Sequence, residues 1–399
     1  MTTLRAQRVA VAAVFFLNGA AFASWAVRLP ALQERHGLGE GALGMALLGA
    51  AAGLFVGLLA ASALTARHGS RQVTVVAALA YLAAVPLLAL APGPVTLGAA
   101  LVAVGFTNGS LDLAMNAQAV VVERRYGRSI MSSFHGFFSG GGIAGAAAGG
   151  LAAAGGVALL PHLLATAVVL GAVLAAATTA LPVESAQARA HEAGKPVLVL
   201  PRGPLLALGA LAFCVLMAEG AINDWSAVYL RTVLDAGPGT AALGFALFAA
   251  AMTAGRLSGD RLVTLFGPTR VVRFGGGLAS LGMLATVLAP GPALALAGFG
   301  LVGLGLAAVF PVVLAAAGRT PGVRSASALA AASTAGYLGF LTGPPLIGLI
   351  AELTGLRGGL GVVVACTALP LLLAGRVEPR SQVAELRSEG RAEGLRSAA

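Results

Sequence analysis

Twelve runs of predominantly apolar residues restrict this chain's fold more than any other feature of the sequence. A helix of about 20 apolar residues is long enough to cross the hydrocarbon core of a bilayer. Charged residues or Pro/Gly turns separate the runs. The sequence therefore predicts twelve membrane crossings, at residues 9–28, 41–64, 73–91, 95–121, 130–154, 157–180, 204–230, 240–263, 270–288, 292–317, 325–350 and 358–375.

The composition favours helices in a membrane over a soluble domain. Only 10% of the 399 residues are charged and 58% are hydrophobic, whereas a soluble domain carries about 25% charged residues. Backbone polar groups in lipid must be satisfied within the spanning segment, so runs of this length are helices. The short alternating segments of a β-barrel are missing from the sequence. We therefore expect an all-α membrane protein.

Basic residues fall mainly on one side of the predicted membrane. With the N-terminus in the cytoplasm, all 25 Lys and Arg residues lie on the cytoplasmic side except Arg28, Arg35, Arg231 and Arg357. This bias predicts a multi-pass protein of the cytoplasmic (inner) membrane with both termini inside. An anionic inner leaflet then accounts for the net charge of +10 without nucleic acid. The first run also has features of a cleavable signal peptide, but its counterpart later in the chain favours a retained helix.

The two halves of the sequence repeat each other at an offset near 200 residues. The APGP turn at 91–94 recurs at 289–292, and Trp25 and Trp225 occupy similar places in their runs. Leu101-Val102 with Gly105 also recurs as Leu301-Val302 with Gly305. We therefore expect two parallel six-helix halves, at residues 1–181 and 204–375. A polar linker at 182–203 and a charged tail at 376–399 are both expected in the cytoplasm.

Two predicted cytoplasmic loops carry a related pattern. Residues 64–71 read LTARHGSR, and residues 255–261 read GRLSGDR. Both resemble the loop signature of the major facilitator superfamily, roughly G-x-x-x-D-R-x-G-R-R, although Ala66 replaces the acid in the first copy. The resemblance implies two halves that rock about a central site. The alternative is that the loop charges only set the orientation of the helices in the membrane. It also implies a cytoplasmic gate at Arg67, Gly69, Arg71, Gly255, Arg256, Asp260 and Arg261.

Asp112 is the sharpest functional candidate, because charged groups at membrane depth are costly and mark functional sites. It lies roughly 15 Å from the predicted cytoplasmic end of its helix, on one face with Gly105, Gly109 and Asn116. The segment is similar to helix 4 of the fucose–proton symporters, but the first run has no second acid. The similarity implies that Asp112 carries the coupling proton and that Asn116 contacts substrate. A permanently paired or protonated packing residue is the alternative.

His135 and Glu219 are the other candidate proton-coupling residues. His135 lies in the next predicted helix at a depth similar to that of Asp112, so the two side chains are expected to form a proton relay. A hydrogen-bonded core histidine is the alternative. Glu219 shares a helical face with Asn223. Asp224 is expected to point away from this face, toward the outside or Arg28.

The predicted substrate site is built from polar and aromatic residues on the same helices. In the superfamily that the chain resembles, helices 1, 4, 7 and 10 line the central cavity, and the tenth run here supplies Phe310-Pro311. The two tryptophans alternatively anchor the membrane interface. The candidate substrate-binding residues are Asn18, Trp25, Asn108, Asn116, Asn223, Trp225 and Tyr337.

These features together predict a secondary active transporter. We expect a proton-coupled symporter that moves a small polar solute, such as a sugar or another small metabolite, by alternating access. Its partners would be the solute, protons and membrane lipids, and it would act as a monomer without cofactor or metal. Proton-driven efflux of drugs or amphipathic metabolites is the alternative, which an aromatic content of 6% favours less. The sequence contains no HExxH, nucleophile-elbow or P-loop motif, which argues against an enzyme or an ATP-driven pump.

Overall fold

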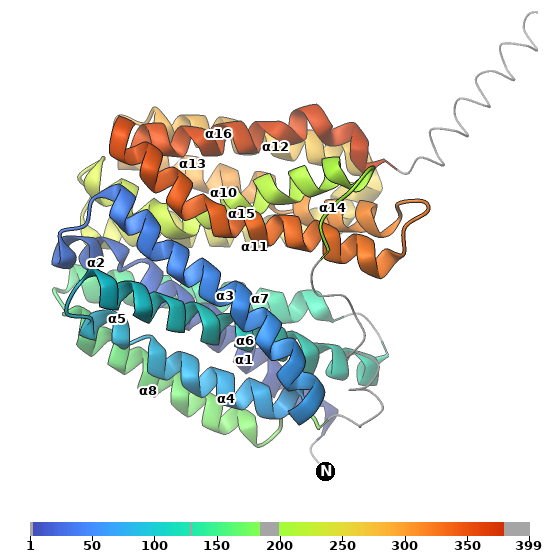
Figure 1. The fold of residues 1–399 in the computed structure, drawn as a ribbon, viewed down its shortest axis with the longest axis horizontal. Helices are drawn as coiled ribbons and strands as arrows, with labels where there is room; N and C mark the ends of the chain where they lie inside the picture. Colours follow the sequence, from blue (N-terminus) through green and yellow to red (C-terminus); the bar gives the residue numbers. More distant parts are fainter. Residues whose placement is uncertain (1–2, 128–129, 184–198, 379–399) are drawn as a thin grey trace, which may run out of the picture.

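The computed structural model describes residues 3–127, 130–183 and 199–378, and only the backbone of Ser132, Asp260 and Ala326. Within these ranges every regular element is a helix (Figure 1). Eleven segments there are long and apolar enough to cross a membrane. Helix α12 (Pro268–Val287) lies at the remaining predicted crossing. The predicted all-α membrane fold is confirmed.

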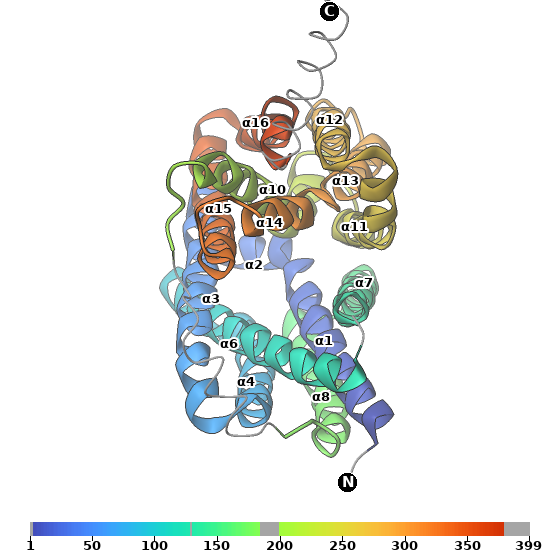
Figure 2. The same ribbon diagram turned by 90° about the vertical axis from the view of Figure 1, so that its right-hand side faces the viewer.

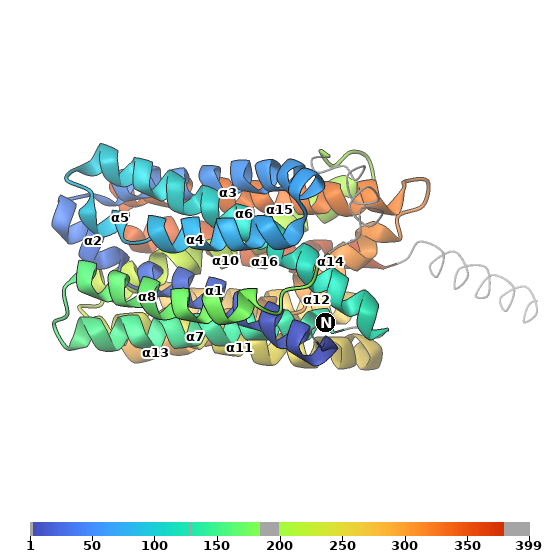
Figure 3. The ribbon, with the colours of Figure 1, turned by 90° about the horizontal axis from the view of Figure 1, so that it is seen from below.

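The helices form two groups, one from each half of the sequence, which lie side by side in Figure 2. Figure 3 shows the helices running along the long axis of the molecule. The first group contains α1 (Leu4–Ala26), α2 (Leu29–His36), α3 (Glu40–His68), α4 (Ser70–Ala84), α5 (Leu87–Leu90), α6 (Pro94–Tyr126), α7 (Met131–Ala154) and α8 (Leu159–Thr178). The second contains α10 (Leu205–Thr232), α11 (Pro238–Phe266), α12, α13 (Pro292–Leu306), α14 (Val309–Gly318), α15 (Ser325–Thr354), α16 (Leu356–Leu373) and the 3-10 turn η1 (Ala374–Val377).

Two predicted crossings are broken into two helices each: residues 73–91 correspond to α4 with α5, and residues 292–317 to α13 with α14. A third break separates α1 from α2, which lies just beyond the predicted first crossing at 9–28. Each break has a proline close to it: Pro30, Pro86 and Pro311. Proline lacks the N–H group that a helix interior requires and clashes with the preceding turn. A hydropathy run records only apolar character, so it does not resolve these breaks.

The sequence repeat is visible in the backbone geometry. Gly69 (φ 84, ψ 150) joins α3 to α4, and Gly267 (φ 80, ψ 158) joins α11 to α12. Positive φ favours glycine, because other residues are strained there. Gly93 and Gly291 likewise precede α6 and α13 with nearly identical angles, each followed by a proline at the start of the helix. Both pairs lie 198 positions apart (69 and 267, 93 and 291), so the backbone repeats at that offset.

The two groups contact each other near one end of the bundle. We call the end that holds residue 4 and residue 378 the basic end, because Arg67, Arg71 and Arg261 lie there, and the other the opposite end (Figure 1). At the opposite end Arg231 approaches Glu34 at 3.8 Å. The backbone N–H of Gly41 donates a hydrogen bond of 2.8 Å to the Glu352 carboxylate. These contacts hold α10 to α2 and α15 to α3.

Candidate functional site

A cavity of about 290 Å³ lies between the two groups of helices. Its walls come from α1, α3, α6 and α7 on one side and from α10, α11 and α15 on the other. Most of the residues predicted from the sequence to bind substrate or protons do line it: Asn18, Trp25, Asn108, Asp112, Glu219, Asn223 and Tyr337. The structure therefore brings these side chains together around one central space.

Close helix packing places Asp112 at the cavity wall. A Cβ atom added at Gly105 or Gly109 would collide with the backbone carbonyl of Ala50 or Leu54 on α3. These two glycines are four residues apart, and such spacing lets membrane helices approach closely. The polar stripe predicted on α6 therefore has two uses. Its glycines seat the helix on α3, and Asp112 reaches the cavity.

Asn116 contacts Asp112 and does not line the cavity. Its side-chain amide donates to the backbone carbonyl of Asp112 at 2.8 Å and to the Asp112 carboxylate at 3.3 Å. In this conformation the donor group of Asn116 is used within α6, and the expected contact with substrate stays a prediction. A residue one helical turn along reaches back to its neighbour as readily as outward. Asn116 positions the carboxylate of Asp112.

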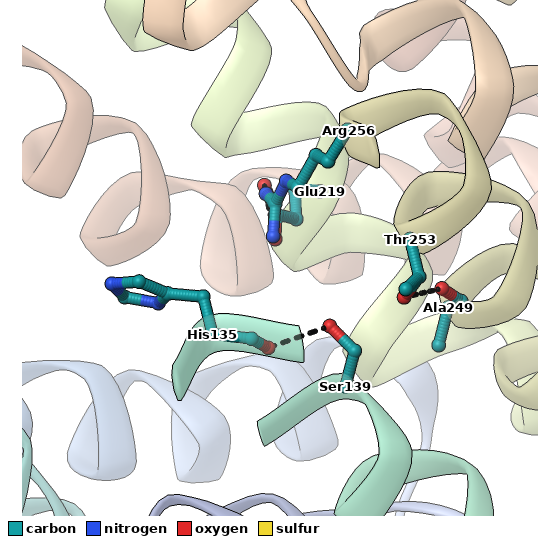
Figure 4. Close-up of polar contacts among 6 residues, drawn as sticks. All are labelled: His135, Ser139, Glu219, Ala249, Thr253 and Arg256. Atoms are coloured by element: carbon teal, nitrogen blue, oxygen red, sulfur yellow. Dashed lines mark hydrogen bonds and ion pairs between the residues drawn. The ribbon is translucent and has the colours of Figure 1, made fainter. Parts of the chain in front are cut away.

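Glu219 and Arg256 form an ion pair in the cavity wall (Figure 4). A guanidinium nitrogen of Arg256, on α11, lies 3.4 Å from both carboxylate oxygens of Glu219, on α10. Arg256 was expected at the cytoplasmic gate, and the structure corrects this placement. It lies ten residues from the end of α11 at Phe266, roughly 15 Å along the helix. The loop pattern identified the arginine, but its long side chain points into the bundle.

His135 does not pair with Asp112. Its ring meets the edge of Phe15 with 5.4 Å between centroids, and its backbone carbonyl accepts a hydrogen bond from Ser139 at 3.2 Å (Figure 4). In the described part of the chain no contact joins His135 to Asp112, and His135 is absent from the cavity lining. The expected relay is therefore corrected. Similar depth on consecutive helices did not predict a contact, because α7 packs mainly on α1 and α11.

Asp224 lines the cavity, contrary to the expectation that it points away from it. Asn223 also lines it, so two consecutive residues of α10 face the same space. They are about 100° apart on a helix, and a cavity that curves around α10 reaches both. Within the described residues no side chain forms an ion pair with Asp224. Its position was missed because a single helical face was assumed for α10.

Aromatic side chains form much of the remaining wall, and the sequence reasoning did not single them out. They are Phe22, Phe55, Phe138, Phe245, Phe248 and Phe340. Phe22 of α1 and Phe245 of α11 lie 6.0 Å apart and meet across the two halves. Phenylalanines are common in apolar runs, so only the arrangement of the helices identifies those that face the cavity.

Several expected features lie outside the cavity. Trp225 is fully buried and contributes no lining atom, whereas Trp25 lines the cavity and donates to Tyr81 at 3.4 Å. Because both tryptophans are at most 3% exposed, the interfacial-anchor alternative is wrong for both. The tenth crossing, α13 with α14, supplies no lining residue. Phe310 instead packs near Gly336 on α15.

The other expected gate residues lie near the basic end. Arg67, Arg71 and Arg261 are exposed, and Arg71 donates to the carbonyl of Thr178 at 3.0 Å. Gly69 forms the turn after α3, whereas Gly255 packs closely against Ala307 between α13 and α14. The side chain of Asp260 lies outside the described residues, as do the linker residues 184–198 and the tail residues 379–399. The gate role of these residues stays a prediction.

The cavity has more acid than base. Its charged lining residues are Asp112, Glu219, Asp224 and Arg256, and Arg256 pairs with Glu219. Asn18 also lines the cavity, and its Oδ1 is buried without a hydrogen-bond partner. Such a site is suited to holding protons, cations or hydrogen-bond donors. Among the described residues no cluster suits a metal ion.

Comparison with known proteins agrees with this architecture. Residues 11–319 match the family model for the Major Facilitator Superfamily. An uncharacterized MFS-type transporter of Yersinia pestis is 38% identical over 92% of this chain and 93% of its own length. The membrane protein MosC of Rhizobium meliloti is 35% identical over 90% and 89%. The crystal structure of a D-xylose–proton symporter superposes with a TM-score of 0.72 at 14% identity, covering 92% of this chain and 96% of that one.

Proposed function

The chain belongs to the major facilitator superfamily of transporters, and from that membership we propose that it is a secondary active transporter coupled to protons through Asp112. Its substrate is a small polar solute, and it works by alternating access in the cytoplasmic membrane with both termini inside. The observation that carries the proposal is the central cavity between the two halves, with a carboxylate at its wall. The resemblance to the fucose–proton symporters is part of this proposal.

The contacts between the halves support alternating access. The ion pair and hydrogen bond that join the halves in the described part of the chain lie at the opposite end. Nearer the basic end, His135 is exposed and the Arg256 side chain is 36% exposed, although both lie on membrane-spanning helices. With the basic end in the cytoplasm, this is an inward-facing state. The outward-facing state requires these contacts to separate and the basic end to close.

Asp112 is the better coupling candidate of the two acids predicted to couple protons. Glu219 already has a positive partner in Arg256, which balances its charge. Asp112 has a neutral amide partner in Asn116 and no basic partner among the described residues. A carboxylate in a partly apolar cavity can take up a proton and lose its charge, which lowers the cost of closing the site around it.

Proton flux in proteoliposomes tests the coupling role. Vesicles that contain the protein and a trapped pH-sensitive dye are given sugars, amino acids and amines in turn. We expect at least one compound to drive proton movement with the wild-type protein. The Asp112→Asn variant should bind the same compound, measured by thermal stabilisation, but move no protons. The matched control is Asp235→Asn, the same change at an exposed residue between α10 and α11. Substrate-driven proton flux through Asp112→Asn would contradict the coupling role.

The aromatic lining favours a second candidate, proton-driven efflux of amphipathic compounds. Six phenylalanines line the cavity, and flat apolar compounds bind well against such walls. Expression in a drug-sensitive host separates the two functions. Raised inhibitory concentrations for amphipathic compounds, lost in Asp112→Asn, would support efflux, and an unchanged panel would count against it.

A further inference from the structure

Two acids in the cavity have no positive partner. Glu219 and Arg256 cancel each other at 3.4 Å. That leaves Asp112 and Asp224 as the other charged lining residues, and no described basic side chain forms an ion pair with either. Uncompensated charges are costly once water is excluded. A cavity that closes around its cargo therefore needs two positive charges. The coupling proton on Asp112 is one of them, so the cargo must bring the other.

Independently, two residues of the cavity lining have buried hydrogen-bond acceptors without a partner. Asn18 is 1% exposed, and its amide donates to the Met115 sulfur at 3.6 Å. Its Oδ1 is buried and has no hydrogen-bond partner, and the same holds for Asn108 Oδ1, although both residues line the cavity. A buried polar atom without a partner is rare in folded proteins and costs free energy. Both atoms accept hydrogen bonds, so rotation of either side chain toward the cavity would offer an acceptor to a ligand with N–H or O–H groups.

The aromatic residues near these acceptors suit a cation. Phe22 meets Trp25 edge-on at 5.4 Å and Phe245 at 6.0 Å, and all three line the cavity. Aromatic faces attract positive charge, because the ring carries negative potential above its plane. The same rings pack well against an apolar or flat part of a ligand.

We propose that the transported molecule carries one protonated amine, which pairs with the carboxylate of Asp224, together with a ring or another compact body that packs on the aromatic wall. This inference rests on the proposed transport function, and it narrows the polar solute to a monovalent organic cation. One proton on Asp112 and one ammonium group at Asp224 bring the cavity to neutrality. Asp112 and Asp224 then have different tasks, the first for the proton and the second for the cargo.

Matched pairs of ligands test the charge requirement on the purified full-length protein. Each pair has an amine and an alcohol of similar size: 2-phenylethylamine with 2-phenylethanol, cyclohexylamine with cyclohexanol, and glucosamine with glucose. Thermal unfolding is followed over a range of each compound at pH 7, since a ligand that binds the folded state raises the melting temperature. We expect the amine of at least one pair to stabilise at a concentration about tenfold lower than the alcohol, the size expected for a charge-assisted contact.

Variants locate the amine. Asp224→Asn should remove the preference for the amine over the alcohol. Asp224→Glu keeps the negative charge, so it should retain the preference. If Asp224→Asn does not fold, Asp224→Glu still tests whether the charge matters. Asp235→Asn should behave as wild type, because Asp235 has a φ of 49, which asparagine adopts readily. Equal stabilisation by amine and alcohol, no stabilisation by any amine, or a preference that survives in Asp224→Asn overturns the proposal. An amine preference without amine-driven proton flux overturns proton coupling instead, so the two failures are distinguishable.

Discussion

Helix α6 of the first half and the α13–α14 segment of the second occupy corresponding positions, yet only α6 reaches the cavity. Both begin at a proline after an extended glycine. Both place a glycine against the partner helix of their own half, since Gly105 contacts Ala50 on α3 and Gly303 contacts Phe248 on α11. Gly105 and Gly303 lie 198 positions apart, as Ala50 and Phe248 do. This glycine contact between the two helices is therefore repeated at the same offset in both halves.

The chemistry on this scaffold is not repeated. The same offset places Phe310 opposite Asp112, and Pro311 follows it. α6 continues unbroken from Pro94 to Tyr126, whereas the second copy breaks between Leu306 and Val309 and turns Phe310 toward α15. In the second half the charge comes from α10 and α11, as the Glu219–Arg256 pair and Asp224. Duplicated packing thus supports an asymmetric site, because only the wall from the second half contains an ion pair, whereas each wall has one acid without a base.

The largest expected effect comes from breaking the shared scaffold at Gly105. Gly105→Val puts a branched side chain where even a Cβ overlaps the Ala50 carbonyl, so α6 and α3 must separate. Overpacking of this kind costs about 3 kcal/mol, near the upper part of its usual range. We expect little folded protein by size-exclusion chromatography, and a lowered melting temperature in what remains.

The corresponding change in the second half should be milder. The contact at Gly303 is less close than the one at Gly105, so Gly303→Val should cost roughly 2 kcal/mol. Gly98→Val, on the same helix as Gly105 but with open space beside it, is the matched control and should melt like wild type. If Gly303→Val proved the more damaging, the two halves would not depend on this packing in the same way.

The next effect concerns the ion pair that only the second half possesses. Arg256→Gln leaves Glu219 without its positive partner and adds a third uncompensated acid to the cavity. The pair is partly exposed, at 36% and 18% for the two side chains, so we expect about a tenfold loss of substrate-driven proton flux rather than the larger loss typical of a fully buried pair. The double variant Glu219→Gln with Arg256→Gln should recover part of that flux. A double variant as slow as Arg256→Gln alone would show that the arginine has a role apart from Glu219.

The same contrast explains what the sequence could predict. The helix boundaries follow from hydropathy and from Pro/Gly turns, so the twelve predicted runs agree with the helices to within a few residues at most ends. The repeat was also predicted, but its register was wrong by two residues where Gly105 was matched to Gly305. Gly305 packs on Gly275 of α12, and Gly303 is the true counterpart. In an Ala/Gly-rich chain, an alignment of the two halves that is shifted by two residues still matches similar residues. The shifted residue, however, faces a different neighbouring helix.

The site was predicted in part, for a related reason. Helical periodicity identified Asp112, Glu219 and Asn223 as facing inward, and they line the cavity, as do the predicted substrate-binding residues Asn18 and Asn108. Periodicity failed for Asp224, and the loop pattern failed for Arg256, because the place of both depends on how α10 and α11 lie against each other. The prediction failed for His135 because helices that follow each other in sequence are not always packed neighbours. Periodicity defines a face of a helix, and only tertiary packing decides what that face meets.

A smaller effect is expected where the two halves meet. Glu352 of α15 accepts from the Gly41 N–H in the first turn of α3, where the helix dipole favours a negative charge. Because Glu352 is exposed, Glu352→Gln should weaken the contact by roughly 0.5–1 kcal/mol. We expect the outward-facing population to rise two- to fivefold, by about the amount that this free energy implies. The measurement is the rate at which a membrane-impermeant maleimide labels Ala51→Cys in the cavity from outside, with Cys214 and Cys366 replaced by alanine.

Glu123 supplies the control for this experiment. Its carboxylate accepts from the N–H groups of Ile130 and Met131 at 2.8 and 2.7 Å, and so it also caps a helix, but entirely within the first half. Glu123→Gln should lower the melting temperature without changing the labelling rate. A labelling rate that rises equally in both variants would indicate general loosening, and not release of the contact between the halves.

The smallest effect is expected for the other contact between the halves. Arg231 and Glu34 are 3.8 Å apart, and the Glu34 side chain is 63% exposed, so Glu34→Gln should cost between about 0 and 0.5 kcal/mol. Its effect on labelling should disappear in 0.5 M salt, since screening over roughly 4 Å removes most of an exposed charge interaction. The Glu352→Gln effect should persist, because that carboxylate forms a direct hydrogen bond to backbone. If salt erased the labelling effects of Glu34→Gln and Glu352→Gln equally, charge alone would join the halves at this end. The hydrogen bond from the Gly41 N–H at the start of α3 would then not contribute.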